Sequence, residues 1–370
     1  MISLDQGLLG LKETGDVIER HSIYGRAVEE LQIIVFAPVE GFHRVAENVV
    51  ARSTAAESRM GHLLRGVRIA AGLFRERTYD LVVTQDPMIT GALGLILKYR
   101  FGARLLVHMH GDFLGREGWY KRGLRRRALL QLSRIVLRRA DAVRVMSEDQ
   151  KRSLEGIGVS GSRVRVIATP VDVSRFAAPG ADGFTIARPF LKRWPRTILM
   201  VGRKDPVKDY DTLFKAISLV FARRSDVGLW LVGNYTEYDD IPLPRDRVRL
   251  TPRVDGQTMP LVYRSADVVV LSSRSESFGK VLVEANASGK PVVATATAGA
   301  REIVMHGYNG YLVEVGDYEG LSCYLLRILD QPETAERLGD NGREYVNKRF
   351  AANTSKITDF WHDIIGEAGQ

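Results

Sequence analysis

Apolar residues along this chain follow two patterns, and each predicts a different element. Over residues 57–77 they recur every three or four positions, which predicts an amphipathic helix with one buried face. Residues 31–36, 81–84 and 105–109 are short apolar runs without alternation, as in strands covered on both faces. A small-residue helix is expected at 90–99, between two of these strands. Strands and helices therefore alternate, which predicts a doubly wound parallel sheet.

The second half of the chain repeats this alternation, so a second α/β domain is expected. Buried strands are predicted at 197–201 and 268–271, and each is followed by a glycine-containing turn and a helix. The 370 residues are enough for two domains with full cores. The predicted divisions are a first domain at 1–178, a linker with several Pro and Gly at 179–195, a second domain at 196–350 and an amphipathic C-terminal helix within 351–370.

The strand at 268–271 leads into a turn and a helix that carry two carboxylates. Glu276 lies in the turn, and Glu284 lies in the helix expected to begin at 280. A helix N-terminus after a parallel strand favours an anion, because its N–H groups and dipole point there. A phosphate-bearing ligand is therefore expected, with Glu276 accepting from sugar hydroxyls and Glu284 holding a ribose diol. Taken alone, this spacing more often belongs to a structural unit with solvated glutamates.

Cations follow the other predicted strand of this domain. Gly202, Arg203 and Lys208 lie between that strand and the next helix, where positive charge could stabilise a diphosphate leaving group. Asp209 and Asp211 form an Asp-x-Asp sequence that could hold a divalent metal. Because they stand at a helix start, where Asp is a favoured cap, we expect capping and no metal site.

The first domain offers one imidazole and one glycine loop as candidates. His110 directly follows the strand at 105–109, at the edge where ligands bind, whereas His108 is expected to pack in the core. Gly7 and Gly10 lie after residues 1–4, which have the pattern of the end of a strand. We expect this first strand to be incomplete, so upstream residues should raise the melting temperature.

Four motifs in the second domain resemble the donor-site signature of the family 4 retaining glycosyltransferases. They are Glu-Ser-Phe-Gly-Lys-Val-Leu-Val-Glu-Ala from 276, Gly-Lys-Pro-Val-Val-Ala-Thr from 289, Gly-Ala-x-Glu-Ile-Val from 299 and Asn-Gly-Tyr-Leu-Val from 309. The resemblance covers nearly the whole chain and is strongest over 197–317. It implies the GT-B fold, in which two Rossmann-like domains face a cleft and the C-terminal helix packs back on the first domain. Ser277, where the family commonly has Gly, Pro170 in Thr169-Pro-Val-Asp, and the short start depart from the family pattern.

The resemblance also implies roles for single residues. Arg203 and Lys208 would bind the diphosphate in place of a metal, Glu284 the ribose, and His110 the donor sugar near the reacting carbon, with retention of configuration. The implied donor-binding set is Gly202, Arg203, Lys208, Arg253, Val254, Glu276, Ser277, Phe278, Gly279, Lys280, Val281 and Glu284. The implied catalytic residues are His110, Glu276, Arg203 and Lys208, and the acceptor or phosphate loop would include Gly7, Gly10 and Asp112. No cofactor or metal is expected beyond the nucleotide-sugar co-substrate.

The formal charge of +9 is confined to the first half of the chain. Residues 1–178 carry 28 Lys and Arg against 19 Asp and Glu, whereas residues 179–370 carry 25 of each. The excess peaks at 116–139, a basic and helical segment that suits an anionic membrane surface or an ordinary solvated helix face. Nucleic acid is not expected, because no nucleic-acid module accompanies the charge.

The expected function is sugar transfer from a nucleotide sugar to a glycan or lipid-linked acceptor, in envelope polysaccharide or glycolipid synthesis. The lone Cys323 excludes an internal disulfide and is expected to be buried, which fits a cytoplasmic chain that associates peripherally with the inner leaflet. Two alternatives stay open. A sugar-nucleotide epimerase of this fold would need no acceptor, and a non-catalytic basic protein that binds membrane or nucleic acid would need no nucleotide.

Overall fold

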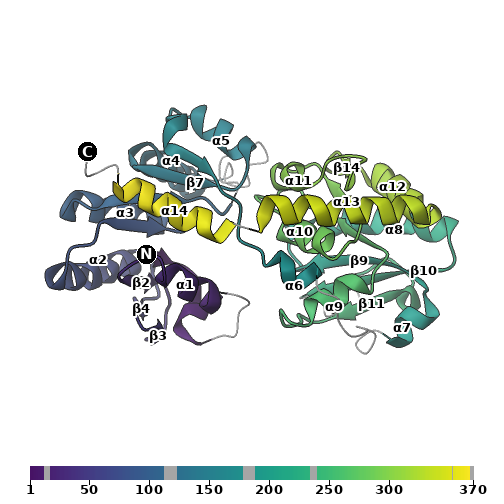
Figure 1. The fold of residues 1–370 in the computed structure, drawn as a ribbon, viewed down its shortest axis with the longest axis horizontal. Helices are drawn as coiled ribbons and strands as arrows, with labels where there is room; N and C mark the ends of the chain where they lie inside the picture. Colours follow the sequence, from purple (N-terminus) through teal and green to yellow (C-terminus); the bar gives the residue numbers. More distant parts are fainter. Residues whose placement is uncertain (12–16, 112–122, 178–187, 234–239, 352, 367–370) are drawn as a thin grey trace. The chain divides into compact units, whose positions relative to one another are not determined.

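The computed structural model describes residues 1–11, 17–111, 123–177, 188–233, 240–351 and 353–366. The chain divides into two compact units, Met1–Ala168 with Asn353–Gln370 (unit 1) and Thr169–Ala352 (unit 2). Each unit is built on its own sheet with helices around it (Figure 1). This confirms the predicted fold class, two doubly wound Rossmann-like domains. Unit 2 begins before the boundary predicted at residue 178.

Unit 1 has an eight-stranded sheet in the order β3-β4-β2-β1-β5-β6-β7-β8 within the described residues. All neighbouring strands are parallel except β3 and β4. The strands are β1 (Ile2–Ser3), β2 (Leu31–Val35), β3 (Phe42–Ala46), β4 (Val49–Ser53), β5 (Leu81–Thr84), β6 (Arg104–His108), β7 (Ala142–Val145) and β8 (Val164–Val166). The helices are α1 (Val17–Gly25), α2 (Arg59–Glu76), α3 (Ile89–Phe101), α4 (Leu124–Arg139), α5 (Glu148–Glu155) and α14 (Asn353–Gly366).

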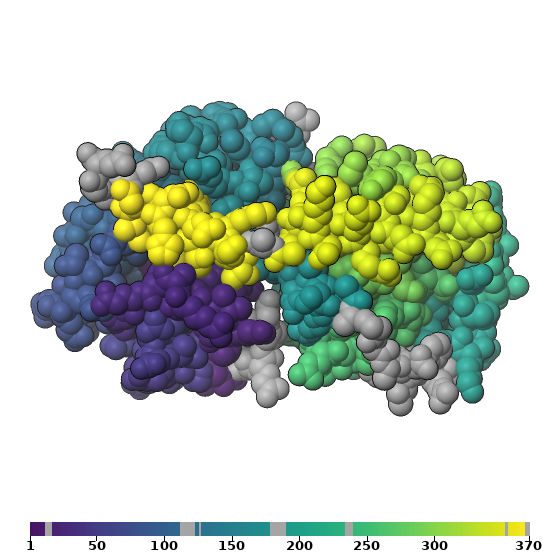
Figure 2. Space-filling model, viewed as in Figure 1, coloured from purple at the N-terminus to yellow at the C-terminus, as the bar shows by residue number. Residues whose placement is uncertain are grey.

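Helices cover both faces of this sheet, as its unalternating strands require. Ile34 packs in one core cluster with residues of α2, α3 and α4, whereas its neighbours Ile33 and Val35 belong to the cluster on the other face. That second cluster also contains Ile357, Phe360, Trp361 and Ile364 of α14. Figure 2 shows the yellow C-terminal helix lying against the purple start of the chain. The last helix is therefore part of the core of unit 1.

The hairpin of β3 and β4 was missed by the sequence interpretation. Its β3 lies at the sheet edge, and none of its five residues is fully buried. An edge strand that packs little apolar surface gives a weak hydrophobic pattern.

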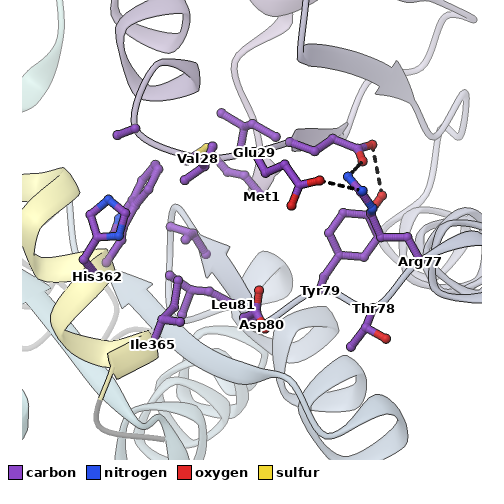
Figure 3. Close-up of a pocket in the computed structure, with 15 residues that line it drawn as sticks. Met1, Val28, Glu29, Arg77, Thr78, Tyr79, Asp80, Leu81, His362 and Ile365 are labelled. Atoms are coloured by element: carbon purple, nitrogen blue, oxygen red, sulfur yellow. Dashed lines mark hydrogen bonds and ion pairs between the residues drawn. The ribbon is translucent and has the colours of Figure 1, made fainter. Parts of the chain in front are cut away.

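The first strand is short, and its neighbours extend beyond it. Ile2 pairs with Ile34 of β2 and Thr84 of β5, and both of those strands begin earlier in the register than β1. The space in line with β1 is a cavity of about 250 Å³, lined by Met1, Leu31 and Leu81 together with Trp361 and Ile365 of α14, among others (Figure 3). Burial lowers the pKa of the Met1 amino group to about 5.

We expect a chain extended by three β-branched residues, Val-Ile-Val, before Met1 to be more stable. The added residues would continue β1 between β2 and β5 and move the amino group out of the sheet. Filling the cavity with apolar side chains should raise the melting temperature of unit 1 by about 5 °C. Thermal unfolding followed by circular dichroism measures this shift.

A Gly-Ser-Gly extension of the same length is the control, because it adds backbone without apolar side chains. The pH dependence is a second readout. Between pH 8 and pH 5 the Met1 amino group is mostly neutral in the folded protein and mostly charged in the unfolded chain. The unextended chain should therefore lose stability as the pH falls through this window. Equal melting temperatures for the two extensions would contradict the account of the cavity.

Unit 2 has a six-stranded sheet in the order β11-β10-β9-β12-β13-β14, and all its neighbouring strands are parallel within the described residues. The strands are β9 (Arg196–Gly202), β10 (Val227–Gly233), β11 (Val248–Thr251), β12 (Val268–Leu271), β13 (Val292–Thr295) and β14 (Gly310–Val313). The helices are α6 (Val173–Ala177), α7 (Arg188–Arg193), α8 (Tyr210–Arg223), α9 (Met259–Arg264), α10 (Lys280–Ala287), α11 (Ala298–Ile303), α12 (Tyr318–Asp330) and α13 (Pro332–Phe350).

The predicted linker is partly helical, and part of it is not described. Residues 179–187 lie outside the described residues, whereas α7 follows as a helix of unit 2. Phe190 of α7 lies over Gly228 of β10, and a Cβ at Gly228 would stand 2.6 Å from the Phe190 ring. Residues 188–193 therefore pack on the unit 2 sheet and do not form a linker.

One burial prediction for a helix is wrong. Cys323 of α12 is exposed and not buried, because the apolar side of this helix is formed by Leu321, Leu325 and Ile328. In α4, which the sequence left open as a membrane-facing or solvated helix, Leu124 and Ile135 are 82% and 44% exposed. The buried residues of α4 are instead Ser133, Val136 and Leu137.

Within the described part of the chain, none of the helices combines the length and the apolar character that a membrane span requires.

Candidate active site

The predicted donor-site residues gather where the unit 2 sheet reverses its order. From β9 the chain builds β10 and β11 on one side, and it then returns to place β12 on the other side. Open parallel sheets bind ligands outside the carboxyl ends of the two strands at such a switch point. Those ends are Gly202 of β9 and Leu271 of β12. The residues that follow them are the predicted cations and the predicted carboxylate.

Glu276 and Lys208 form an ion pair at this switch point. The Lys208 ammonium donates to Oε1 of Glu276, and the two side chains are 18% and 16% exposed. The Ser273 hydroxyl donates to the same oxygen at 2.9 Å. Charge-assisted hydrogen bonds of this kind hold a carboxylate in one orientation. The structure therefore brings together one predicted cation and one predicted carboxylate that are 68 positions apart.

Hydrogen bonds to the main chain join the two loops that carry this pair. The Ser272 hydroxyl donates to the Lys208 carbonyl at 2.8 Å, and the Arg274 amide donates to the Val207 carbonyl at 2.8 Å. These bonds fix the loop after β12 against the loop after β9. The position of Lys208 relative to Glu276 is thus set by the backbone as well as by the ion pair.

The first turn of α11 supports the backbone of Glu276. The Gly299 amide of α11 donates to the Glu276 carbonyl at 2.8 Å. A Cβ at Gly299 would lie 2.5 Å from the Phe278 backbone, so only glycine allows this approach. The Gly299 amide therefore fixes the backbone of the loop that carries Glu276.

The Asp209 carboxylate accepts hydrogen bonds from neighbouring side chains. It has φ +49° in the left-handed region, and its carboxylate accepts from Arg274 at 3.0 Å and from the Thr212 hydroxyl at 2.8 Å. It stands at the predicted cap position of α8, but its side chain makes no hydrogen bond to the backbone of the helix. In the part of the chain that the structure describes, no cluster of three or more His, Cys, Asp or Glu could hold a metal ion.

Arg203, the other predicted cation, lies in the same segment between β9 and α8 as Lys208 but is more exposed to solvent. Its side chain is 76% exposed and stands 3.9 Å from the Asp205 carboxylate. Gly202 precedes it as the last residue of β9. Arg203 is therefore free to reorient at little cost in packing, unlike Lys208.

Glu284 is buried in α10 and is bound by a tyrosine. Gly279, with φ +85°, is the N-cap of α10. Lys280 and Glu284 are four positions apart in this helix and therefore lie one turn apart. The Tyr263 hydroxyl donates to Oε2 of Glu284 at 2.7 Å, and Lys280 Nζ stands 3.6 Å from Oε1. Burial, and next the charge of Glu284, raise the pKa of Tyr263 well above its usual value. The hydroxyl therefore keeps its proton and acts as a donor.

The remaining predicted donor-site residues lie around this loop or after the edge strand β11. Ser277 and Val281 are half-buried, and the Phe278 ring is buried against Phe350 at 5.6 Å between ring centroids. Arg253 and Val254 follow β11, which is separated from β12 by the two strands β10 and β9 in the sheet. Among the described residues, no hydrogen bond or ion pair joins Arg253 to Glu276 or Glu284. Its place in the donor-binding set stays a prediction.

His110 lies at the carboxyl end of β6 in unit 1. Its ring stands 5.7 Å from that of His108, which is buried as predicted and contacts the buried guanidinium of Arg144 at 3.4 Å. The protein atoms around the His110 ring, and next the charge of Arg144, lower the pKa of His110, although the residue keeps exposed surface. Its imidazole is therefore neutral at pH 7. Gln150 donates to the Gly111 carbonyl at 3.2 Å and supports the turn.

The predicted glycine loop of unit 1 uses its amides internally. The Gly7 amide donates to the Asp5 carboxylate at 3.0 Å, and the Gly10 amide donates to the Gly7 carbonyl at 3.1 Å. Asp112, the third residue of this predicted acceptor loop, lies outside the described residues. The acceptor assignments stay predictions.

Comparison with known proteins identifies the family. The family described as "Glycosyl transferases group 1" matches residues 186–345, which include β9 to β14 and the whole ion-paired loop. The "Glycosyl transferase 4-like domain" matches residues 27–170, most of unit 1. The chain belongs to the group 1, GT4-like glycosyltransferases. The predicted family is therefore confirmed, and the epimerase and non-catalytic alternatives are set aside.

Named relatives of this glycosyltransferase support the same family. A D-inositol 3-phosphate glycosyltransferase of Corynebacterium glutamicum is 26% identical over 83% of this chain and 84% of the relative. Sucrose-phosphate synthase from Thermosynechococcus elongatus matches the structure with a TM-score of 0.84, at 22% identity and 99% coverage of both chains. Anabaena HepE, solved in complex with UDP-glucose, gives 0.77 at 20% identity, with 98% of this chain and 99% of HepE covered. The fold is that of the GT-B glycosyltransferases.

The sequence interpretation missed two residues of this glycosyltransferase site. Ser273 lies two residues after the buried strand β12 and three before the predicted carboxylate, and that position was a usable signal. Tyr263 has no comparable signal, because a tyrosine between Val262 and Arg264 in a short helix reads as ordinary core. Only the packing of α9 against α10 brings its hydroxyl to Glu284.

Proposed function

We propose that this glycosyltransferase moves a sugar from a nucleotide-sugar donor to a glycan or lipid-linked acceptor, with retention and without a metal ion. The observation that carries the proposal is the pairing of Lys208 with Glu276 at the switch point of unit 2. A cation there can stabilise the charge that develops on a departing diphosphate. The carboxylate beside it can orient the sugar through its hydroxyls. The HepE complex with UDP-glucose is in keeping with such a donor.

The remaining residues take the roles that the family resemblance implies. Arg203 would bind the diphosphate together with Lys208, and Glu284 would bind the ribose. His110 of unit 1, as a neutral imidazole, would donate a hydrogen bond to the donor sugar. Two side-chain cations in place of a divalent metal are consistent with the Asp209 carboxylate being bound by Arg274 and Thr212.

A sugar-transfer assay tests this proposal. UDP-, GDP- and ADP-sugars are supplied with candidate glycan and polyprenyl-phosphate acceptors, and release of the nucleoside diphosphate is measured with and without EDTA. We expect one donor to be consumed, EDTA to leave the rate unchanged, and proton NMR of the product to show the anomeric configuration of the donor. Loss of activity in EDTA would contradict the role of the two cations, and an inverted product would contradict retention.

We also propose that unit 1 meets an anionic membrane surface, which suits a lipid-linked acceptor in envelope polysaccharide or glycolipid synthesis. The exposed face of α4 carries Leu124 and Ile135, and the exposed Arg125, Arg127 and Arg139 flank them. An apolar strip between arginines is typical of helices that lie in the membrane interface. Residues 116–122 of the predicted basic segment lie outside the described residues.

Vesicle flotation tests the membrane proposal. The wild type is expected to float with vesicles that contain phosphatidylglycerol but not with phosphatidylcholine alone. The double variant Arg125→Glu and Arg127→Glu should lose flotation, because each cation near the surface contributes about 1 kcal/mol. Arg223→Glu with Lys348→Glu, which reverses two exposed charges in unit 2, should float like the wild type. Equal flotation of the two double variants, or binding to nucleic acid only, would contradict the proposal.

A further inference from the structure

Glu284, the predicted ribose ligand, accepts a hydrogen bond from Tyr263. Tyr263 belongs to α9, outside the motif that carries Glu276 and Glu284, and its side chain is fully buried. We propose that Tyr263 is a positioning residue for nucleotide recognition, whose hydroxyl fixes the Glu284 carboxylate so that it recognises the ribose diol. This inference rests on the proposed function of the same site.

The contact is short and closed from the solvent. Tyr263 Oη stands 2.7 Å from Oε2 of Glu284, and both residues are buried. The second oxygen, Oε1, is directed toward Lys280 Nζ at 3.6 Å, and that lysine side chain is 42% exposed. One carboxylate oxygen of Glu284, Oε2, is thus held by a buried hydroxyl. The other oxygen, Oε1, faces the more exposed ammonium group of Lys280.

The tyrosine itself has little freedom to move. The Phe176 ring of α6 contacts the Tyr263 ring edge to face, with 5.8 Å between centroids, and Phe176 is buried. Helix α6 also packs on α10, which carries Glu284. A buried hydroxyl held in this way has one direction in which to donate. The raised pKa of Tyr263 keeps this hydroxyl protonated at neutral pH.

A fixed carboxylate has a chemical consequence for its ligand. A vicinal diol presents two hydroxyl donors in a fixed geometry, so a carboxylate that cannot rotate accepts them without losing conformational freedom on binding. A carboxylate that rotates would pay that entropy and would tolerate a ligand with only one hydroxyl. Tyr263 should therefore increase the preference for ribose over 2′-deoxyribose, and it should act on binding more than on the chemical step.

Isothermal titration calorimetry of UDP, GDP and ADP and their 2′-deoxy counterparts tests this. The wild type is expected to bind one ribonucleotide about tenfold more tightly than its 2′-deoxy form, a difference of about 1.4 kcal/mol. In Tyr263→Phe the ribonucleotide should bind about tenfold more weakly while the 2′-deoxy form changes little, so the ratio falls toward one. With the matching nucleotide sugar, KM should rise about tenfold and kcat should change less than twofold.

Tyr324→Phe is the matched control, because it removes the hydroxyl of another tyrosine of unit 2, which is half-buried, lies outside the donor-site motifs and stacks on Tyr311. It should bind all nucleotides like the wild type. Adding Tyr263→Phe to Glu284→Ala should change the affinity by less than about twofold, because Tyr263 acts through Glu284. This comparison holds even if Tyr263→Phe lowers the melting temperature.

The outcomes separate this inference from the proposed function. If Tyr263→Phe weakens the ribo- and 2′-deoxynucleotides equally, or leaves the ratio unchanged, Tyr263 is only structural and the inference is overturned alone. A full additional loss in the double variant has the same meaning. If the wild type binds none of the three nucleotides, the proposed function is overturned and the inference falls with it.

Discussion

The Glu276→Gln variant is expected to transfer sugar about 100-fold more slowly than the wild type, the usual cost of a misplaced reacting group. The amide keeps the size of the side chain but removes the charge that binds Lys208 and weakens the bond from Ser273. The sugar would then be held less firmly against the leaving group. Because Lys208 loses its carboxylate partner, its charge becomes available to a diphosphate. The nucleoside diphosphate should therefore bind at least as tightly as before, and the loss should appear in kcat.

Glu314→Gln is the control for this variant, since that side chain is 83% exposed on the same unit. It should leave kcat and the dissociation constant unchanged. Initial rates of nucleotide release and calorimetry of the nucleoside diphosphate measure the two quantities. An unchanged kcat in Glu276→Gln, or an equal loss in both variants, would contradict the role given to Glu276.

The second large effect is expected at the two cations. Lys208→Ala should lower kcat/KM by about 100- to 1000-fold, because it removes one preorganised charge from the developing diphosphate. Arg203→Ala should also weaken nucleotide binding. The Arg203 side chain is 76% exposed, so removing it should leave the melting temperature of the unliganded protein unchanged. Lys208→Ala, in contrast, leaves the half-buried Glu276 without its ion pair and should lower that temperature.

Lys204→Ala provides the comparison within the same loop. Lys204 is the neighbour of Arg203 in sequence and pairs with Asp240, and it lies outside the predicted diphosphate pair. Its kcat/KM should stay within about twofold of the wild type. Steady-state kinetics of the three variants at one ionic strength gives the comparison, because salt screens all exposed cations alike. Equal losses for Arg203→Ala and Lys204→Ala would show only a general effect of positive charge.

Much of this site could be predicted because its signals are local. The apolar run of β12, Gly279 at the start of α10 and the spacing of Glu276 and Glu284 all lie within about 20 consecutive residues. The meeting of Lys208 with Glu276 followed from the rule that ligands bind at the carboxyl ends of neighbouring strands. The sequence does not state that β9 and β12 are neighbours, and the family resemblance supplied that link.

The missed features depend on contacts between distant segments. The Tyr263 hydroxyl reaches Glu284 only because α9 packs on α10. The Gly299 amide reaches the Glu276 carbonyl only because the start of α11 approaches the loop after β12. The burial predicted in α12 was wrong where one face had to be chosen among several apolar residues, as for Cys323. A helix period gives the spacing of a buried face, but the neighbouring elements decide which face it is.

The most direct test of the account is a thermal-shift panel of UDP, GDP and ADP on the wild type and on Lys208→Ala. The central claim is that the switch point of unit 2 binds a nucleoside diphosphate. At about 100 times its dissociation constant, a ligand stabilises the folded protein by about 2.7 kcal/mol, which is a shift of several degrees. The account predicts such a shift with one nucleotide in the wild type and its loss in Lys208→Ala. No shift with any nucleotide, or the same shift in both proteins, would contradict it.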